Sequence, residues 1–253
     1  MTQNRIIPCL LLKNGGLVKT VNFSKPTYIG DPINAIKIFN DKEVDELIVL
    51  DIDASRELQA PNFSLIKQFA SECFMPLSYG GGIQNSIHAM KLFELGVEKI
   101  SIQTAALQSF NLIEEIAKKA GNQSIIMSID IKKNWLGKYE LYSSTKKKII
   151  KRDWRQFIKD SVSAGAGEIL INSVDQDGKM QGMDLNLIEI TSNLVNVPIV
   201  SAGGVGSMKD IKDSIIAGSS AVAVGSFFVY YGPHKAVLIS YPNTEELKEL
   251  INF

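Results

Sequence analysis

Short runs of apolar, often β-branched residues alternate along the chain with longer stretches in which apolar residues recur every three or four positions. The first pattern is typical of buried strands and the second of helices with one apolar face. Strands are predicted near residues 6–12, 46–52, 76–79, 98–103, 124–131, 167–173, 197–202 and 220–225. Helices are predicted at 32–41, 60–73, 86–95, 109–121, 153–165, 185–194, 208–217 and 243–252.

Eight strands, each followed by a helix, predict a closed (β/α)₈ TIM barrel of the α/β class. An open, doubly wound sheet is the alternative, but no strand pattern marks a sheet edge. Such a barrel uses about 250 residues as a single domain, so residues 1–253 are expected to form one domain.

The two halves of the chain resemble each other. Gly81-Gly82-Ile83 matches Gly203-Gly204-Val205, and Leu95-Gly96 matches Ala217-Gly218, each pair 122 residues apart (203 − 81, 218 − 96). Asp45-Glu46-Leu47-Ile48 matches Gly167-Glu168-Ile169-Leu170 at the same offset. A shared offset over three kinds of element indicates a duplicated half-barrel, with halves of about 1–122 and 123–253.

Composition excludes several classes of protein. The 27 basic and 27 acidic side chains balance, which argues against a general nucleic-acid binder. The apolar runs are too short to cross a membrane, and the N-terminus carries no signal-peptide pattern, so a cytoplasmic protein is expected. Cys9 and Cys73 form neither a disulfide framework nor a zinc motif, and no metal or cofactor is expected.

Two glycine-rich turns follow the third and seventh predicted strands, where barrels of this class place their chemistry. Each turn has a hydroxyl-bearing residue after the next strand, and glycine lets the backbone approach an oxyanion closely. We therefore predict two phosphate sites, although the glycines could simply make tight turns. The candidate residues are Gly81, Gly82, Thr104, Gly203, Gly204, Gly225 and Ser226, with Lys19 in the first strand–helix connection.

Asp130 ends the fifth predicted strand and is a candidate general acid or base; capping of the next turn is the alternative. Asp51, Asp53, Asp175 and Asp177 follow the second and sixth strands, and some of them could be turn residues.

Aligning the two half-barrels places Leu11 opposite Asp130. If the ancestral site used a pair of carboxylates, one of them is replaced here by a side chain that cannot move protons.

Four charged residues precede strands at the other end of the barrel: Arg5, Glu46, Lys99 and Glu168. Two positive and two negative charges could form a closed ring, or they could be a solvated rim of little energetic weight. The run Lys146–Lys148 is expected in an exposed hairpin or loop, and His88 and His234 are expected to be surface or packing residues.

The chain resembles the HisF cyclase subunit of imidazole glycerol phosphate synthase over nearly its whole length. The matching motifs are Arg5-Ile6-Ile7-Pro8-Cys9-Leu10, Asp45-Glu46-Leu47, Gly80-Gly81-Gly82-Ile83, Lys99-Ile100-Ser101-Ile102, Arg152-Asp153-Trp154, Gly165-Ala166-Gly167-Glu168-Ile169-Leu170 and Ser201-Ala202-Gly203-Gly204. The resemblance implies ammonia transfer from a HisH-like glutaminase docked below the barrel. It also implies that Arg5, Glu46, Lys99 and Glu168 form an ammonia gate and that a bisphosphate occupies the two glycine turns.

Three features depart from the cyclases: Leu11 in place of an aspartate, Gln103 in place of an asparagine, and the tail Gly232–Pro242. These departures resemble the paralogue associated with glycosyl amidation in surface-polysaccharide pathways (WbuZ type). There, a separate ATP-dependent amidotransferase is expected to use the ammonia to convert a sugar acetamido group to an acetamidino group. A working cyclase of histidine biosynthesis and a non-catalytic activator of the glutaminase are the alternatives; the cyclase would need Asp51 or Asp177 as a substitute proton carrier.

Overall fold

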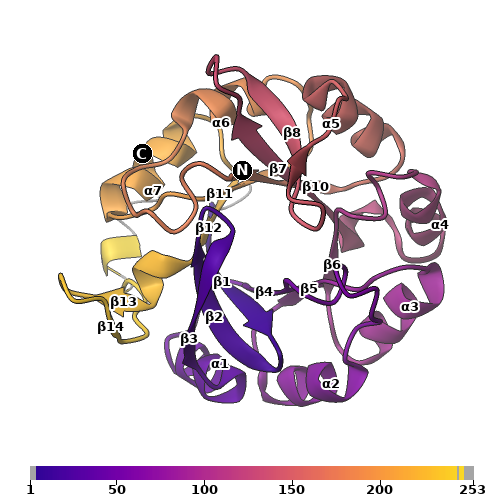
Figure 1. Cartoon of the computed structure of the whole chain (residues 1–253). Coiled ribbons are helices and arrows are strands. Elements are labelled where there is room, and N and C mark those ends of the chain that lie inside the picture. Colours follow the sequence, from indigo (N-terminus) through magenta and orange to yellow (C-terminus); the bar gives the residue numbers. More distant parts are fainter. Residues whose placement is uncertain (1–3, 244, 248–253) are drawn as a thin grey trace.

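The computed structural model describes residues 4–243 and 245–247 and shows a closed barrel of parallel strands (Figure 1). The strands of the barrel follow in the order β1 (Arg5–Lys13), β4 (Leu47–Asp51), β5 (Leu77–Gly80), β6 (Lys99–Ile102), β7 (Ile125–Lys133), β10 (Glu168–Ser173), β11 (Ile199–Ala202) and β12 (Ala221–Val224). Pairing of β12 with β1 closes the ring, so the predicted barrel is confirmed and the open-sheet alternative is wrong.

Seven α-helices of the described part surround the barrel. They are α1 (Pro32–Asp41), α2 (Phe63–Glu72), α3 (Ser86–Glu94), α4 (Asn111–Ala120), α5 (Trp154–Ser163), α6 (Leu185–Ser192) and α7 (Met208–Ile216). Side chains cap most of their N-termini, as Asp153 does for α5 by accepting the amide hydrogens of Arg155 and Gln156. Of the predicted last helix, residues 245–247 are helical, whereas 244 and 248–252 lie outside the described residues.

Three additional hairpins lie in the segments that follow barrel strands. Each begins at the carboxyl end of its strand. The first connection contains β2 (Gly16–Val21) and β3 (Ser24–Gly30), so the segment expected as a loop around Lys19 is largely a strand. β8 (Tyr139–Ser143) pairs with β7 and with β9 (Lys148–Ile149), and the tail forms β13 (Tyr230–Tyr231) and β14 (Ala236–Val237). Short 3₁₀ turns lie at Asn122–Ser124 and Ser226–Phe228.

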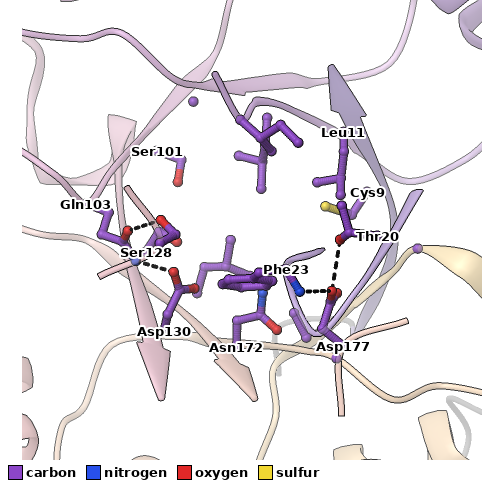
Figure 2. Close-up of a pocket in the computed structure, with 18 of the residues that line it drawn as sticks. Cys9, Leu11, Thr20, Phe23, Ser101, Gln103, Ser128, Asp130, Asn172 and Asp177 are labelled. Carbon is purple, nitrogen blue, oxygen red and sulfur yellow. Dashed lines mark hydrogen bonds between the residues drawn. The ribbon is translucent and has the colours of Figure 1, made fainter. Parts of the chain in front are cut away.

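Because all eight strands run the same way, the barrel has two different ends. The amino ends of the strands form the end that we call the floor, and their carboxyl ends surround a cavity that we call the mouth (Figure 2).

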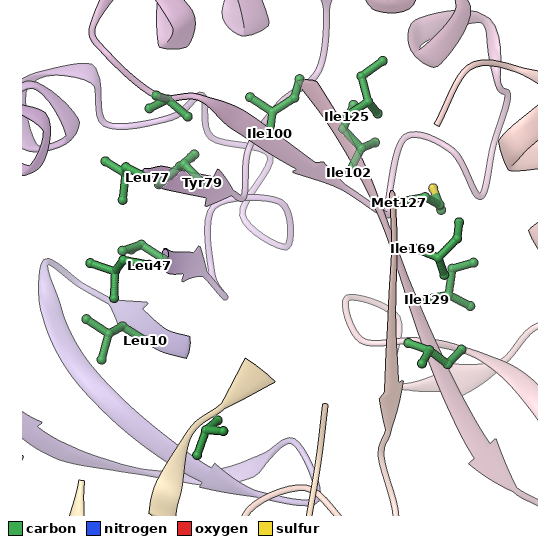
Figure 3. Close-up of a cluster of buried hydrophobic side chains, with 14 of the residues drawn as sticks. Leu10, Leu47, Leu77, Tyr79, Ile100, Ile102, Ile125, Met127, Ile129 and Ile169 are labelled. Carbon is green, nitrogen blue, oxygen red and sulfur yellow. The ribbon is translucent and has the colours of Figure 1, made fainter. Parts of the chain in front are cut away.

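Two apolar layers hold the barrel in place. The larger one lies between the strands and the helices, where Leu10, Tyr79, Ile100 and Ile169 are buried (Figure 3). The smaller one fills the inside of the barrel and consists of Ile7, Ile48, Ile126, Leu170, Val200, Ala221 and Ala223. The barrel is therefore a packed cylinder with an apolar interior between floor and mouth.

The turn between β7 and β8 presents a large aromatic side chain to solvent. The Asn134 side chain accepts the amide hydrogens of Leu136 and Lys138, which fixes the turn, and Trp135 is 90% exposed. The other tryptophan, Trp154, is buried at the start of α5.

Gly82 shows why the glycine turns need glycine. Its φ is +71°, and a Cβ added there would lie 2.6 Å from the carbonyl oxygen of Gln59 in the preceding connection. Gly204 occupies the equivalent place in the second half, and a Cβ added there would lie 2.1 Å from the carbonyl oxygen of Gly182. Packing of neighbouring connections thus contributes to the requirement for glycine at both turns.

We expect Gly82→Ala to destabilise the protein more than Gly137→Ala. Both positions have nearly the same φ, +71° and +75°, but a Cβ at Gly137 meets no atom within 4 Å. Backbone strain alone should cost about 1 kcal/mol at Gly137, whereas the added clash should raise the cost to about 3 kcal/mol at Gly82. Urea unfolding of the two variants measures the difference, and equal losses would contradict the packing argument.

Candidate functional site

The mouth contains a cavity of about 220 Å³ with contributions from every strand of the barrel. Polar side chains reach it from the strand ends and from the connections above them, and apolar residues such as Leu50 and Leu170 line it as well. Since the barrel interior below is apolar, this cavity is where polar chemistry can take place.

Among the three acids that line the cavity, Asp51, Asp130 and Asp177, Asp130 is the most buried. It lies on β7, is 5% exposed, and accepts a hydrogen bond of 2.6 Å from Gln103 Nε2. Gln103 is itself held by Ser144, whose hydroxyl donates to Gln103 Oε1 at 2.7 Å. Burial raises the pKa of Asp130 to about 7, and the negative charge of Asp177 contributes to the rise. At neutral pH this carboxyl group can therefore give or take a proton.

Leu11 lines the same cavity from β1, across from Asp130 (Figure 2). Its place in the strand is fixed by pairing with Leu50 of β4 and Val18 of β2. The position opposite Asp130 thus carries a branched alkyl group, as the half-barrel alignment predicted.

Asp177 holds the β2–β3 hairpin over the mouth. Its carboxylate accepts hydrogen bonds from the Thr20 hydroxyl at 3.0 Å and from the amide of Phe23 at 3.3 Å. These bonds place the ring of Phe23 near the centre of the cavity, as Figure 2 shows. Burial raises the pKa of Asp177, while the bonds to Phe23 and Thr20 and the charge of Lys19 oppose the rise.

The remaining candidate acids differ in their partners. Asp51 lines the cavity, but one of its oxygens accepts the amide hydrogens of Asp53 and Ala54. Asp53 forms ion pairs with Lys13 and Arg56, and Asp175 accepts the amide hydrogen of Lys133. Asp53 and Asp175 therefore stabilise turns, which is the structural role that the sequence left open for part of this set.

Most of the predicted phosphate-site residues do meet at the cavity. The ones that line it are Lys19, Gly81, Thr104, Gly203, Gly204, Gly225 and Ser226. Gly82 lies just outside, and its amide donates to the Ser55 hydroxyl. Lys19 Nζ donates to the carbonyl oxygen of Cys9 at 2.7 Å, and burial lowers the pKa of this lysine.

Among the cavity-lining residues that sequence reasoning missed are Phe23, Arg56, Lys147 and Asn172. Lys147 belongs to the run that was expected to be a solvated face. Asn172 occupies the position on β10 beside Asp130 on β7, a pairing that the predicted strands could have shown.

The four charged residues at the floor form a closed ring. Arg5 Nη1 lies 2.5 Å from Glu46, and its other terminal nitrogen pairs with Glu168. Lys99 Nζ lies 3.2 Å from Glu46 and 3.1 Å from Glu168. Each carboxylate is thus bridged by two cations, and Glu46 also accepts a hydrogen bond from Ser78. Because both glutamates are buried, the pairing compensates charges that would otherwise be costly there.

Residues 4–243 and 245–247 contain no group of three or more His, Cys, Asp or Glu side chains placed to hold a metal ion. Within the same residues, no helix is long and apolar enough to span a membrane. His88 packs edge-on against Phe63, on the helix side of the barrel.

Fold and site together define a (β/α)₈ barrel with an ion-paired floor and an acid-bearing mouth. A family model described as "Histidine biosynthesis protein" matches residues 5–235. A Pseudomonas aeruginosa protein named "Putative imidazole glycerol phosphate synthase subunit hisF2" is 53% identical over 251 residues, which cover 98% of this chain and 99% of that protein.

Other relatives carry related names. The Vibrio vulnificus protein "Putative imidazole glycerol phosphate synthase subunit hisF3" is 43% identical over 258 residues, covering 99% of this chain and 97% of its own. The Helicobacter hepaticus "Imidazole glycerol phosphate synthase subunit HisF" is 38% identical over 226 residues, covering 89% and 90%. The chain belongs to the HisF family of histidine biosynthesis proteins and is a HisF-like synthase subunit.

We expect the stability of the protein to fall as pH rises through the range in which Asp130 ionises. The folded-state pKa of about 7 lies above the usual range, so the unfolded chain loses the proton first. The contribution of protonated Asp130 to the free energy of unfolding is therefore complete below about pH 4 and lost by about pH 7. We expect this contribution to be roughly 2–4 kcal/mol.

Asp130→Asn should remove this part of the pH dependence. Urea unfolding at about pH 5 and at about pH 8 compares the variant with the wild type. Equal pH dependence in both proteins would show that Asp130 has an ordinary pKa.

Proposed function

We propose that this chain is an ammonia-conducting subunit for sugar amidation. A HisH-like glutaminase would dock on the floor and release ammonia, which passes through the barrel to the mouth. A separate ATP-dependent amidotransferase would then use the ammonia to convert a sugar acetamido group to an acetamidino group. The observation that carries this proposal is Leu11, an alkyl group facing Asp130 where a cyclase needs a second carboxylate.

The mouth offers no free replacement for that carboxylate among the described acids. Asp177 is hydrogen-bonded to Thr20 and Phe23 of the β2–β3 hairpin, and Asp51 is hydrogen-bonded to two backbone amides of its own turn. Loss of one member of an acid–base pair costs about 10²–10⁴-fold in rate. This argument favours conduction of ammonia over cyclisation by this chain.

The floor ring supports a gating role for Lys99. This residue has a single charged nitrogen between Glu46 and Glu168, whereas Arg5 bridges the same two carboxylates by itself. Movement of Lys99 would therefore open a path while Arg5 keeps both glutamates paired. Above the ring, the apolar layer of Ile7, Ile48, Ile126 and Val200 favours a small neutral molecule over an ion.

The phosphate turns are the second part of the proposed mouth site. Gly81 with Thr104, and Gly203 and Gly204 with Gly225 and Ser226, would bind the two phosphates of an anionic ligand. Their places on opposite halves of the barrel favour one ligand with a phosphate at each end.

The missing acid leads to a direct test. Purified protein with the bisphosphate cyclase precursor and ammonium salt at raised pH should turn over at least about 100-fold more slowly than a genuine cyclase. Leu11→Asp should increase the rate, while Leu11→Asn, of similar size but without an acid, should not. Turnover of the wild type at cyclase rates would overturn the proposal and favour the role in histidine biosynthesis.

Lys99→Ala tests the gate. The protein should fold with a loss of about 1–3 kcal/mol, because Arg5 still pairs with both glutamates. In the complex with the glutaminase, glutamine-dependent product formation should change relative to formation from added ammonium salt. Lys118→Ala, on the exposed face of α4, is the matched control and should leave the ratio unaltered.

Equal loss in both assays would argue against a gate at Lys99. A barrel that accelerates the glutaminase but passes no ammonia to any acceptor would instead indicate the non-catalytic activator.

A further inference from the structure

The start of β1, beside the ring of charges at the floor, is held partly by side chains. Arg5–Pro8 pair with β12, but pairing of β1 with β4 begins only at Cys9. Ahead of that point, the amide of Ile6 donates to the Asp45 carboxylate at 3.1 Å. The carbonyl oxygen of Ile6 accepts a hydrogen bond of 2.9 Å from the Tyr241 hydroxyl. Two side chains from distant parts of the chain thus fix the backbone at this point.

Tyr241 is itself fixed in the tail. The residue is 9% exposed, and its ring packs edge-on against Phe228, with the ring centroids 5.3 Å apart. The amide of Ser240 donates to the carbonyl oxygen of Phe228 at 2.9 Å, which holds the neighbouring backbone. Burial and the negative charge of Asp45 raise the pKa of Tyr241, so its hydroxyl stays protonated. The tail therefore presents a constant hydrogen-bond donor to the start of β1.

The residues bound in this way are neighbours of two members of the floor ring. Arg5 precedes Ile6, and Glu46 follows Asp45 in the sequence. Arg5 reaches Glu46 with one terminal nitrogen and Glu168 with the other. Because the guanidinium is a planar fork, contact with both carboxylates requires one position of the arginine. A shift of the backbone at Ile6 would therefore weaken at least one of these ion pairs.

We propose that Tyr241, together with Asp45, is a positioning residue of the floor ring. It holds the backbone beside Arg5, so that this arginine keeps both glutamates paired while Lys99 moves. The inference rests on the proposed function, since that function makes the ring an ammonia gate. It also gives a role to the tail Gly232–Pro242, which the resemblance to the cyclases left unexplained.

A double-mutant cycle in the free barrel tests whether Tyr241 acts through Arg5. Arg5→Lys keeps the charge but has only one terminal nitrogen for two carboxylates, so it should destabilise the wild type. In the Tyr241→Phe background, where the support is already lost, Arg5→Lys should change the equilibrium constant for unfolding at least about threefold less. Urea unfolding measures both effects. Tyr231→Phe, which removes a hydroxyl from an exposed ring of the β13–β14 hairpin, is the matched control and should leave the effect of Arg5→Lys unaltered.

Nitrogen transfer supplies a readout that a merely structural role of the tail would not move. Amide-¹⁵N glutamine and unlabelled ammonium chloride are supplied together to the complex of barrel, glutaminase and acceptor enzyme. The share of ¹⁵N in the amidated product then measures passage through the barrel. Tyr241→Phe should lower this share at least about threefold, because a displaced Arg5 no longer defines the opening. Tyr231→Phe should leave the share unaltered.

Asp45→Ala removes the other hydrogen bond to Ile6 and should give the same pattern in both experiments. Because Asp45 is exposed, this variant keeps the test decisive if Tyr241→Phe fails to fold.

Additive effects of Arg5→Lys and Tyr241→Phe would overturn the proposal. So would an unaltered share of ¹⁵N in the variants, if the wild-type product does contain the label. Failure of the proposed function gives a different result. The wild-type product would then carry no ¹⁵N, while non-additive unfolding would still establish Tyr241 as the support of Arg5.

Discussion

Closure of eight parallel strands into one ring is the constraint on which the rest of this structure depends. It sends every strand start to the floor and every strand end to the mouth, so residues far apart in sequence meet at two separate places. Arg5 reaches Glu168 across 163 positions at the floor, and Thr20 reaches Asp177 across 157 positions at the mouth. An open sheet with the same strands would form neither group.

The barrel was predictable because its strands are buried on both faces and therefore appear as plain apolar runs. The β2–β3 hairpin was not, since β3 is largely exposed and Ser24–Gly30 carries no alternating apolar face. The β13–β14 hairpin has only two residues in each strand, which is too short for a periodic signal. Hydrophobic patterning finds strands that build a core, and these hairpins contribute little to one.

The candidate site was predictable as a set of positions but not as a set of roles. Strand ends placed Leu11, Asp130 and the glycine turns at the mouth, and strand starts placed the four charged residues at the floor. In sequence, however, Asp51, Asp53, Asp175 and Asp177 are equivalent acids after strands. Their roles diverge through partners such as Lys13 for Asp53 and the Thr20 hydroxyl for Asp177, and those partners depend on how the connections fold.

The turn between β7 and β8 carries an intrinsic fluorescence probe, the exposed side chain of Trp135. Of the two indole rings in the chain, that of Trp154 is buried. That of Trp135 is 90% exposed in the turn that joins β7, the strand of Asp130, to β8. A hydrated indole emits at longer wavelength and is accessible to soluble quenchers. A shielded indole emits at shorter wavelength and is protected from them. Any protein that covers this edge of the barrel would remove water from the Trp135 ring and leave the Trp154 ring unchanged. Fluorescence can therefore report which end of the barrel is occupied.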